Sequence, residues 1–164
     1  MVLLIPDQSS YEETEAAYIE QCDFLKKVGA KCIGVSEQSY SIQGKLDHPI
    51  QEGKYVMNDE EWDRLMTGLK KLGKIAKDKG MVLTFHHHMG TVVQTEEEID
   101  RFMDSVDPDL VYLLFDSGHL SLHIPADWLL PDPVLLLPLP SLHNLLLLIP
   151  ERLVQSPRLR LQAR

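Results

Sequence analysis

The sequence has little of what marks secreted and membrane proteins. Its two cysteines, Cys22 and Cys32, are too few for a disulfide framework and lack the close spacing of a zinc site, so we interpret them as reduced thiols. The apolar run at residues 1–5 has no basic segment before it and stops at Pro6, unlike a signal peptide. No apolar run reaches the roughly 18 residues that a membrane span needs. These absences favour a cytoplasmic protein with no membrane partner.

Positive charge is also scarce, with 16 Lys and Arg against 25 Asp and Glu and a net charge of −9. Because phosphate binding requires a basic surface, this balance argues against nucleic acid as a partner. The apolar fraction of 44% and the charged fraction of 25% are those of an ordinary globular protein. The 164 residues suffice for one domain, whereas a complete (β/α)₈ barrel typically takes about 250.

The composition changes abruptly near residue 120. No lysine follows Lys79, and prolines and leucines crowd the last 44 residues. Frequent proline prevents a long helix or a central strand, yet the segment has too much leucine for a solvated linker. Such conflict between local signals is typical of a sequence that was not selected to fold. We therefore predict a folded domain at 1–120 and an irregular Leu/Pro-rich tail at 121–164, preferring a frameshifted, spliced or mispredicted end over a partner-binding or membrane-surface segment.

Before that boundary, helical and strand patterns alternate. N-cap residues, acidic first turns and terminal glycines predict three helices, and short apolar runs predict three strands. The helices are expected from Ser9 or Ser10 to about Val28, from Asn58 to about Gly80, and from Thr95 to about Asp107; the strands are expected at 30–36, 81–85 and 110–115. Near-continuous apolar strands that alternate with amphipathic helices indicate an α/β fold with a parallel sheet covered by helices.

Three consecutive histidines, His86, His87 and His88, follow the second predicted strand. If the extended backbone continues, His86 and His88 share one face and His87 points to the other. Two imidazoles on one face can bind a divalent ion or a hydroxylated substrate. A solvated polar loop is an equally good interpretation of the triplet alone.

Asp116 and His119 follow the third predicted strand. An aspartate directly after a buried strand stays ionised at low cost beside a cation or several donors, and a metal ion is the natural partner. His119 lies three residues on, in a turn that contains Gly118, and can approach the same point. The alternative is an aspartate that caps the next helix.

A polar loop follows the first predicted strand. Glu37, Gln38 and Lys45 provide carboxylate, amide and ammonium groups that suit a polyol substrate, although an ordinary surface loop would have a similar composition. Thr91 would line the mouth beside the histidines, where Gly90 permits close backbone approach.

Three segments together resemble the inosose dehydratase family, within the xylose isomerase-like TIM-barrel superfamily. They are the runs at 36–45, 86–91 and 115–119, and the similarity is collinear from about Tyr11 to His119. The resemblance implies a partial (β/α)₈ barrel with about three βα units and an atypical C-terminal tail. It also implies a metal-dependent lyase of myo-inositol catabolism that dehydrates scyllo-inosose, a cyclitol ketone, to a trihydroxycyclohexane-dione with Mn²⁺ or Co²⁺ as cofactor.

The resemblance also implies roles for individual residues. Asp116 and His86 match metal-ligand positions at the sixth and fifth barrel strands. His88 and His119 are the candidates for catalytic proton transfer, with substrate contact as the alternative for His88 and support of the metal ligands as the alternative for His119. Substrate contact falls to five residues around the strand ends: Glu37, Gln38, Lys45, His87 and Thr91.

The chain departs from the family where strands one to three and strands seven and eight should supply the rest of the barrel. We therefore expect the chain alone to be inactive, and its open sheet to favour assembly, including homo-oligomers. Two alternatives remain open: a non-catalytic truncated isoform or interaction fragment, and a sugar isomerase or epimerase of the same superfamily.

Overall fold

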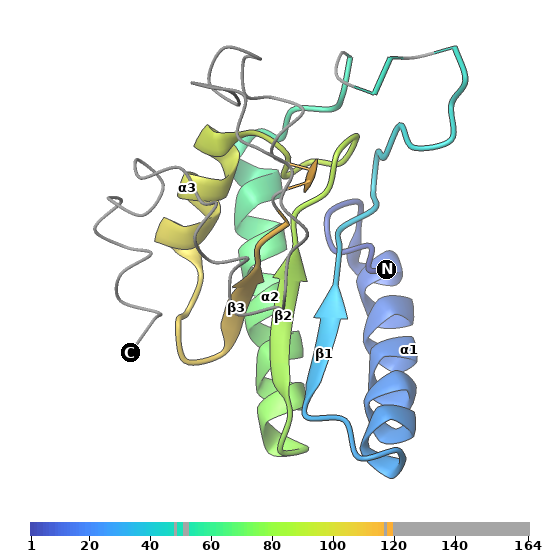
Figure 1. Ribbon diagram of the computed structural model, residues 1–164, viewed down its shortest axis with the longest axis vertical. Coiled ribbons are helices and arrows are strands. Elements are labelled where there is room, and N and C mark those ends of the chain that lie inside the picture. The colour runs from blue at the N-terminus through green and yellow to red at the C-terminus, as the bar shows by residue number, and fades with distance from the viewer. Residues whose placement is uncertain (48, 51–52, 117, 120–164) are drawn as a thin grey trace, which may run out of the picture. The chain divides into compact units, whose positions relative to one another are not determined.

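The computed structural model describes residues 1–47, 49–50, 53–116 and 118–119, which form alternating helices and parallel strands (Figure 1). The predicted tail at 121–164 lies outside the described residues and stays a prediction. In chain order the elements are α1 (Gln8–Lys27), β1 (Cys32–Val35), α2 (Asp59–Asp78), β2 (Val82–His86), α3 (Glu96–Ser105) and β3 (Val111–Leu114). The predicted α/β class is confirmed.

The three strands form one sheet in the order β1-β2-β3, and both pairings are parallel. The register pairs Val35 with Phe85 across β1 and β2, and His86 with Leu114 across β2 and β3. All three strands therefore end at the same edge of the sheet (Figure 1). The histidine run begins with the last residue of β2, and Asp116 follows β3 at this edge.

The two faces of the sheet differ in burial because successive side chains alternate. One face packs against the helices, and its core is fully or almost fully buried; it includes Ile33, Val35, Leu83, Phe85 and Val111, with Leu65, Leu69 and Leu72 supplied by α2. The other face carries apolar side chains that stay about two-fifths exposed: Val82, Tyr112 and Leu114. In a complete barrel this second face would line the interior and be enclosed by the other strands. Its partial exposure is the pattern expected of a partial barrel.

The helix termini show which local signals were decisive. Asn58 and Thr95, the predicted starts of the second and third helices, cap α2 and α3 through reciprocal capping boxes with Glu61 and Glu98. Helix α1 differs, because its N-cap is Asp7, whose side chain accepts the Ser10 N–H at 2.8 Å. Among the described residues, no helix is both long and apolar enough to cross a membrane.

The N-terminal run lies beside the end of β1. Val2 makes a parallel bridge with Glu37, and the Leu4 N–H donates to Glu37 Oε2 at 2.8 Å. Arg64 on α2 donates to the Ile5 carbonyl at 2.7 Å. Val2 thus adds one isolated parallel bridge next to the polar end of β1, and side chains of Glu37 and Arg64 hold Leu4 and Ile5.

Candidate metal and proton-transfer site

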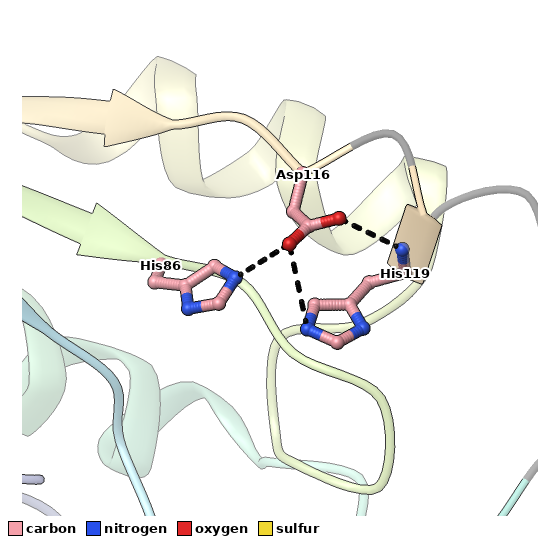
Figure 2. A group of neighbouring side chains, drawn as sticks. All are labelled: His86, Asp116 and His119. Carbon is pink, nitrogen blue, oxygen red and sulfur yellow. Dashed lines mark hydrogen bonds and ion pairs between the residues drawn. The ribbon is translucent and has the colours of Figure 1, made fainter.

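Strand register brings His86 and Asp116 together at the polar edge of the sheet. His86, the last residue of β2, pairs with Leu114, and Asp116 lies two residues beyond Leu114 on the same face. His86 Nε2 consequently lies 3.2 Å from Asp116 Oδ2. Figure 2 shows the two side chains pointing toward one another. The two residues are 30 positions apart in the sequence, and the pairing of neighbouring parallel strands brings them together.

The two carboxylate oxygens of Asp116 have different environments. Oδ1 accepts backbone N–H groups from Gly118 at 2.8 Å and from His119 at 3.1 Å, within the turn after β3. Burial acts to raise the pKa of Asp116, but the His119 N–H, the adjacent His119 and His86 rings and the Gly118 N–H outweigh it and hold the pKa below its ordinary value. Oδ1 thus accepts hydrogen bonds from the turn after β3, while Oδ2 faces the imidazoles of His86 and His119.

His119 is the third side chain of a cluster that can ligate a metal ion. Its Nε2 lies 3.6 Å from Asp116 Oδ2, and one donor atom from each of His86, Asp116 and His119 lies within 4.8 Å of the others (Figure 2). Burial, and then the neighbouring His88, lower the pKa of His119, which keeps a ring lone pair free at neutral pH. Two imidazoles and a carboxylate are a donor set that divalent transition metals accept.

His87 lies on the opposite face, as the alternation predicted. It is fully buried, and its Nε2 accepts the Asp116 N–H at 3.0 Å. Burial and the neighbouring His86 lower the pKa of His87 to about 4, so the ring is neutral at pH 7. With Nε2 as acceptor, the neutral ring carries its proton on Nδ1, which has no hydrogen-bond partner among the described residues.

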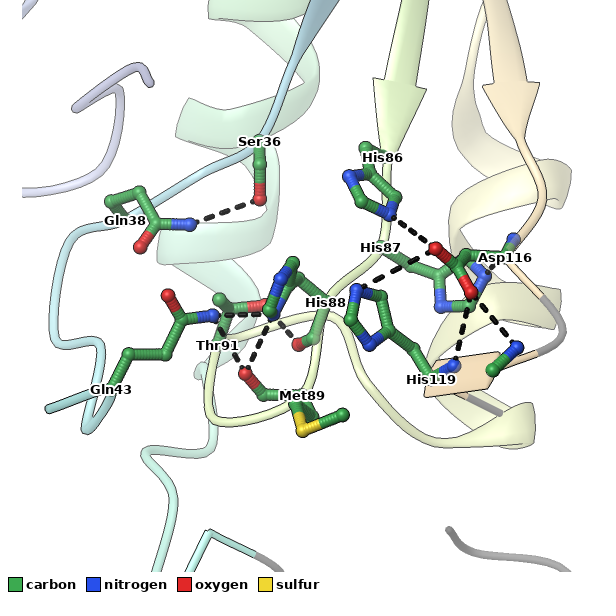
Figure 3. Close-up of polar contacts among 11 residues, drawn as sticks. Ser36, Gln38, Gln43, His86, His87, His88, Met89, Thr91, Asp116 and His119 are labelled. Carbon is green, nitrogen blue, oxygen red and sulfur yellow. Dashed lines mark hydrogen bonds and ion pairs between the residues drawn. The ribbon is translucent and has the colours of Figure 1, made fainter. Parts of the chain in front are cut away.

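His88 returns to the face of His86. Its ring centroid lies 5.3 Å from that of His86 and 3.7 Å from that of His119. On its other side, His88 Nδ1 contacts the side-chain amide of Gln43 (Figure 3). This contact was not predicted, because a glutamine in a polar loop shows no local sign of a partner 45 residues away.

The five residues predicted to contact substrate do not form one surface. Gln38 is partly exposed and Lys45 is exposed, whereas Glu37, His87 and Thr91 are only 1%, 0% and 3% exposed. Both Glu37 oxygens accept buried backbone N–H groups, and the Thr91 hydroxyl donates to the His88 carbonyl at 2.7 Å. Burial raises the pKa of Glu37 despite these donors. The buried three hold backbone segments, and their predicted substrate contacts remain predictions.

A family model described as xylose isomerase-like TIM barrel matches residues 3–140. The chain belongs to the xylose isomerase-like TIM-barrel family. The match extends past the change in composition near residue 120, and it agrees with the parallel sheet and with helices on its covered face.

Several curated relatives of this chain are inosose dehydratases. The chain is 66% identical over 110 residues to one from Clostridium perfringens (strain ATCC 13124) and 61% identical over 110 residues to one from Clostridium beijerinckii, each match covering 67% of this chain. A Lacticaseibacillus casei relative is 56% identical over 112 residues, or 68% of this chain. The predicted resemblance is confirmed, and the chain spans about 37% of the length of these relatives.

Two solved structures share the fold. A xylose isomerase-like TIM-barrel protein from Mycobacterium smegmatis, in complex with magnesium, aligns with a TM-score of 0.56 and 23% identity over 69% of this chain and 38% of its own. The IOLI protein with a bound zinc atom aligns with a TM-score of 0.53 and 22% identity over 72% of this chain and 39% of its own. Both alignments support a partial barrel.

Proposed function

We propose that this chain carries the metal-binding and proton-transfer half of an inosose dehydratase site. The reaction would remove water from scyllo-inosose, with Mn²⁺ or Co²⁺ as cofactor. The observation that carries the proposal is the His86, Asp116 and His119 cluster, whose donor atoms lie within 4.8 Å of one another at the end of the sheet. Sequence identity of 66% to a dehydratase supports the choice of reaction.

The donors fit a divalent ion. His86 Nε2 and Asp116 Oδ2 already face the same point, and Asp116 Oδ1 is fixed by two backbone N–H groups, so the carboxylate does not need to reorient. We assign His86 and Asp116 as metal ligands, and His119, which lies close to both, is assigned to proton transfer. The metal, when bound, supplies Lewis-acid polarisation of a ketone oxygen.

Proton transfer falls to the histidines on the open face. A dehydration needs a base for the proton next to the ketone and an acid for the departing hydroxyl. We assign these roles to His88 and His119, whose rings lie against each other with centroids 3.7 Å apart. The lowered pKa of His119 leaves it neutral near pH 7, as a base requires.

We assign His87 a positioning role, and its predicted substrate contact remains a prediction. The ring is fully buried, and its Nε2 accepts the N–H of Asp116. This hydrogen bond joins His87, which follows β2, to Asp116, which follows β3. It therefore fixes the backbone that carries the Asp116 carboxylate. Partly exposed Gln38 and exposed Lys45 keep their predicted roles toward a polyol.

Metal binding is the direct test. Mn²⁺ and Co²⁺ are titrated into the purified chain by isothermal calorimetry, with thermal melts of the same samples. We expect saturable binding that raises the melting temperature, because a ligand of the native state stabilises it by mass action. Asp116→Ala should abolish both effects, and His86→Gln should weaken them.

Asp109→Ala is the matched control, since Asp109 is an exposed acid in the segment that precedes β3, at the other end of that strand. It should bind metal as the parent does. Equal loss in Asp109→Ala and Asp116→Ala would mean that binding reflects the chain's net negative charge, and the site assignment would fail.

Turnover is tested separately, in this chain and in a chain restored to the length of its relatives. We expect the chain alone to show no turnover and the restored chain to lose water from scyllo-inosose. Rearranged sugar without water loss would favour an isomerase or epimerase. No activity in the restored chain would favour a non-catalytic interaction protein.

A further inference from the structure

The loop after β1 packs closely against the histidine loop after β2. The Ile42 N–H donates to the Gly90 carbonyl at 2.9 Å. Gly90 has φ of +73°, and a Cβ there would lie 3.0–3.3 Å from side chains of Ile50, Ile42 and Gln43. Glycine is therefore required both by its backbone conformation and by the approach of Gln43.

Because the two loops lie close together, the side-chain amide of Gln43 contacts two atoms of the histidine loop at once. Its Nε2 lies 2.8 Å from the Met89 carbonyl oxygen and in short contact with His88 Nδ1 (Figure 3). The carbonyl oxygen can only accept, so the amide must present its NH₂ group, and not its oxygen, on this side. The second hydrogen of that NH₂ group then points to His88 Nδ1.

This arrangement decides the tautomer of His88. His88 Nδ1 also lies 3.0 Å from the Met89 carbonyl and could donate to it if protonated. A protonated Nδ1 would place its N–H against the N–H of Gln43, donor against donor. The consistent solution leaves Nδ1 as acceptor and the proton of the neutral ring on Nε2, the nitrogen turned away from Gln43.

We propose that Gln43 is a positioning residue that holds neutral His88 in the Nε2–H tautomer, so that this ring offers a hydrogen-bond donor to a hydroxyl or ketone oxygen at the cluster. The catalytic meaning of this donor depends on the proposed function, but the tautomer does not. His87 provides an internal contrast, because its Nε2 accepts from Asp116 and its proton lies on Nδ1. Adjacent histidines thus hold opposite tautomers.

The test is a long-range ¹H–¹⁵N correlation spectrum of the full ¹⁵N-labelled chain without metal, at about pH 8, above the ordinary pKa of histidine. The pattern of cross-peaks distinguishes the two neutral tautomers, and His88→Gln and His87→Gln identify the two rings by loss of their signals. We expect Nε2–H for His88 and Nδ1–H for His87.

Gln43→Leu and Gln43→Glu should both reverse the His88 tautomer. Without the amide, Nδ1–H can donate to the Met89 carbonyl, and a carboxylate at position 43 would accept from the same N–H. Gln38→Leu is the control, because Gln38 lies in the same loop and its amide donates to Ser36 Oγ at 3.0 Å. The control should leave both tautomers unchanged.

Three results would overturn the proposal: Nδ1–H for His88 in the parent chain, averaged tautomers for His88 as in a free imidazole, or an unchanged tautomer in both Gln43 variants. A parent chain that gives averaged signals for all its histidines counts as the second result. Metal titration of the same samples separates this proposal from the proposed function. If the chain does not bind metal but the tautomers are as expected, the proposed function is refuted and the tautomer proposal stands.

Discussion

Burial of His87 predicts a specific weakness of the fold in mild acid. The ring is fully buried, and burial, aided by the neighbouring His86, lowers its pKa from 6.5 to about 4. Between these values the unfolded chain binds a proton at this position and the folded chain does not. The stabilising contribution is therefore complete above pH 6.5 and is lost as the pH falls toward 4.

The magnitude follows from the two pKa values. A pKa of 6.5 in the unfolded chain and about 4 in the folded chain corresponds to roughly 3 kcal/mol over the whole titration. Of this, about 2 kcal/mol is lost between pH 7 and pH 5. That loss is large beside the stability of about 5–15 kcal/mol of an ordinary domain.

The assay compares urea unfolding of the parent and His87→Gln at both pH values. Glutamine can place an oxygen near the position of Nε2 and accept the Asp116 N–H, but it does not titrate. The pH-dependent loss should therefore be about 2 kcal/mol smaller in His87→Gln than in the parent. Val93→Ala is the control, because it removes buried volume and no titratable group, and its loss should parallel that of the parent.

Equal losses in the parent and in His87→Gln would refute this reasoning. They would mean that His87 is protonated in the folded chain at pH 5, and thus that its buried bond to Asp116 does not persist there. If Val93→Ala loses more unfolding free energy between pH 7 and pH 5 than the parent does, the pH response reflects low stability and not the His87 ring.

Three further predictions concern the scaffold, each checked by urea unfolding at pH 7. Gly73→Ala should destabilise by about 1–3 kcal/mol, because its Cβ would lie 2.7 Å from the Leu110 carbonyl oxygen; an unchanged stability would mean that α2 and the segment before β3 are not in close contact. Asn58→Ala should cost about 1 kcal/mol through loss of the capping box with Glu61, and no cost would contradict that cap. Leu83→Ala should cost about 2–5 kcal/mol, since the side chain is fully buried in the central strand, and a smaller cost would indicate that the sheet does not pack on its helices.

The sequence predicted the elements best where the deciding interaction is local. Thr95 and Glu98 are three residues apart, so the capping box that starts α3 can be read directly from the sequence. The predicted start of α1 at Ser9 or Ser10 was wrong, although both serines have cap-forming side chains. The structure selects Asp7, and both serines lie in the first turn.

Long-range bonds explain what the sequence did not predict. Glu37 looks like a surface carboxylate in a polar loop, but it is buried because its oxygens accept the N–H groups of Leu4 and Ser39. The pairing of Val2 with Glu37 spans 35 positions and leaves no local periodicity. The alternation of the histidines was predictable, since it needs the strand backbone alone, whereas the contact of Gln43 with His88 depends on how two loops pack.

The site's geometry depends on one strand pair more than on the rest of a barrel. The register of β2 and β3 sets His86 beside Asp116, the His87 bond fixes the backbone of Asp116, and the turn after β3 returns His119 to the same carboxylate. All three constraints lie within residues 86–119. Metal affinity and the histidine tautomers can therefore be measured in this chain, whereas we expect turnover to need a complete barrel that encloses the substrate and excludes water.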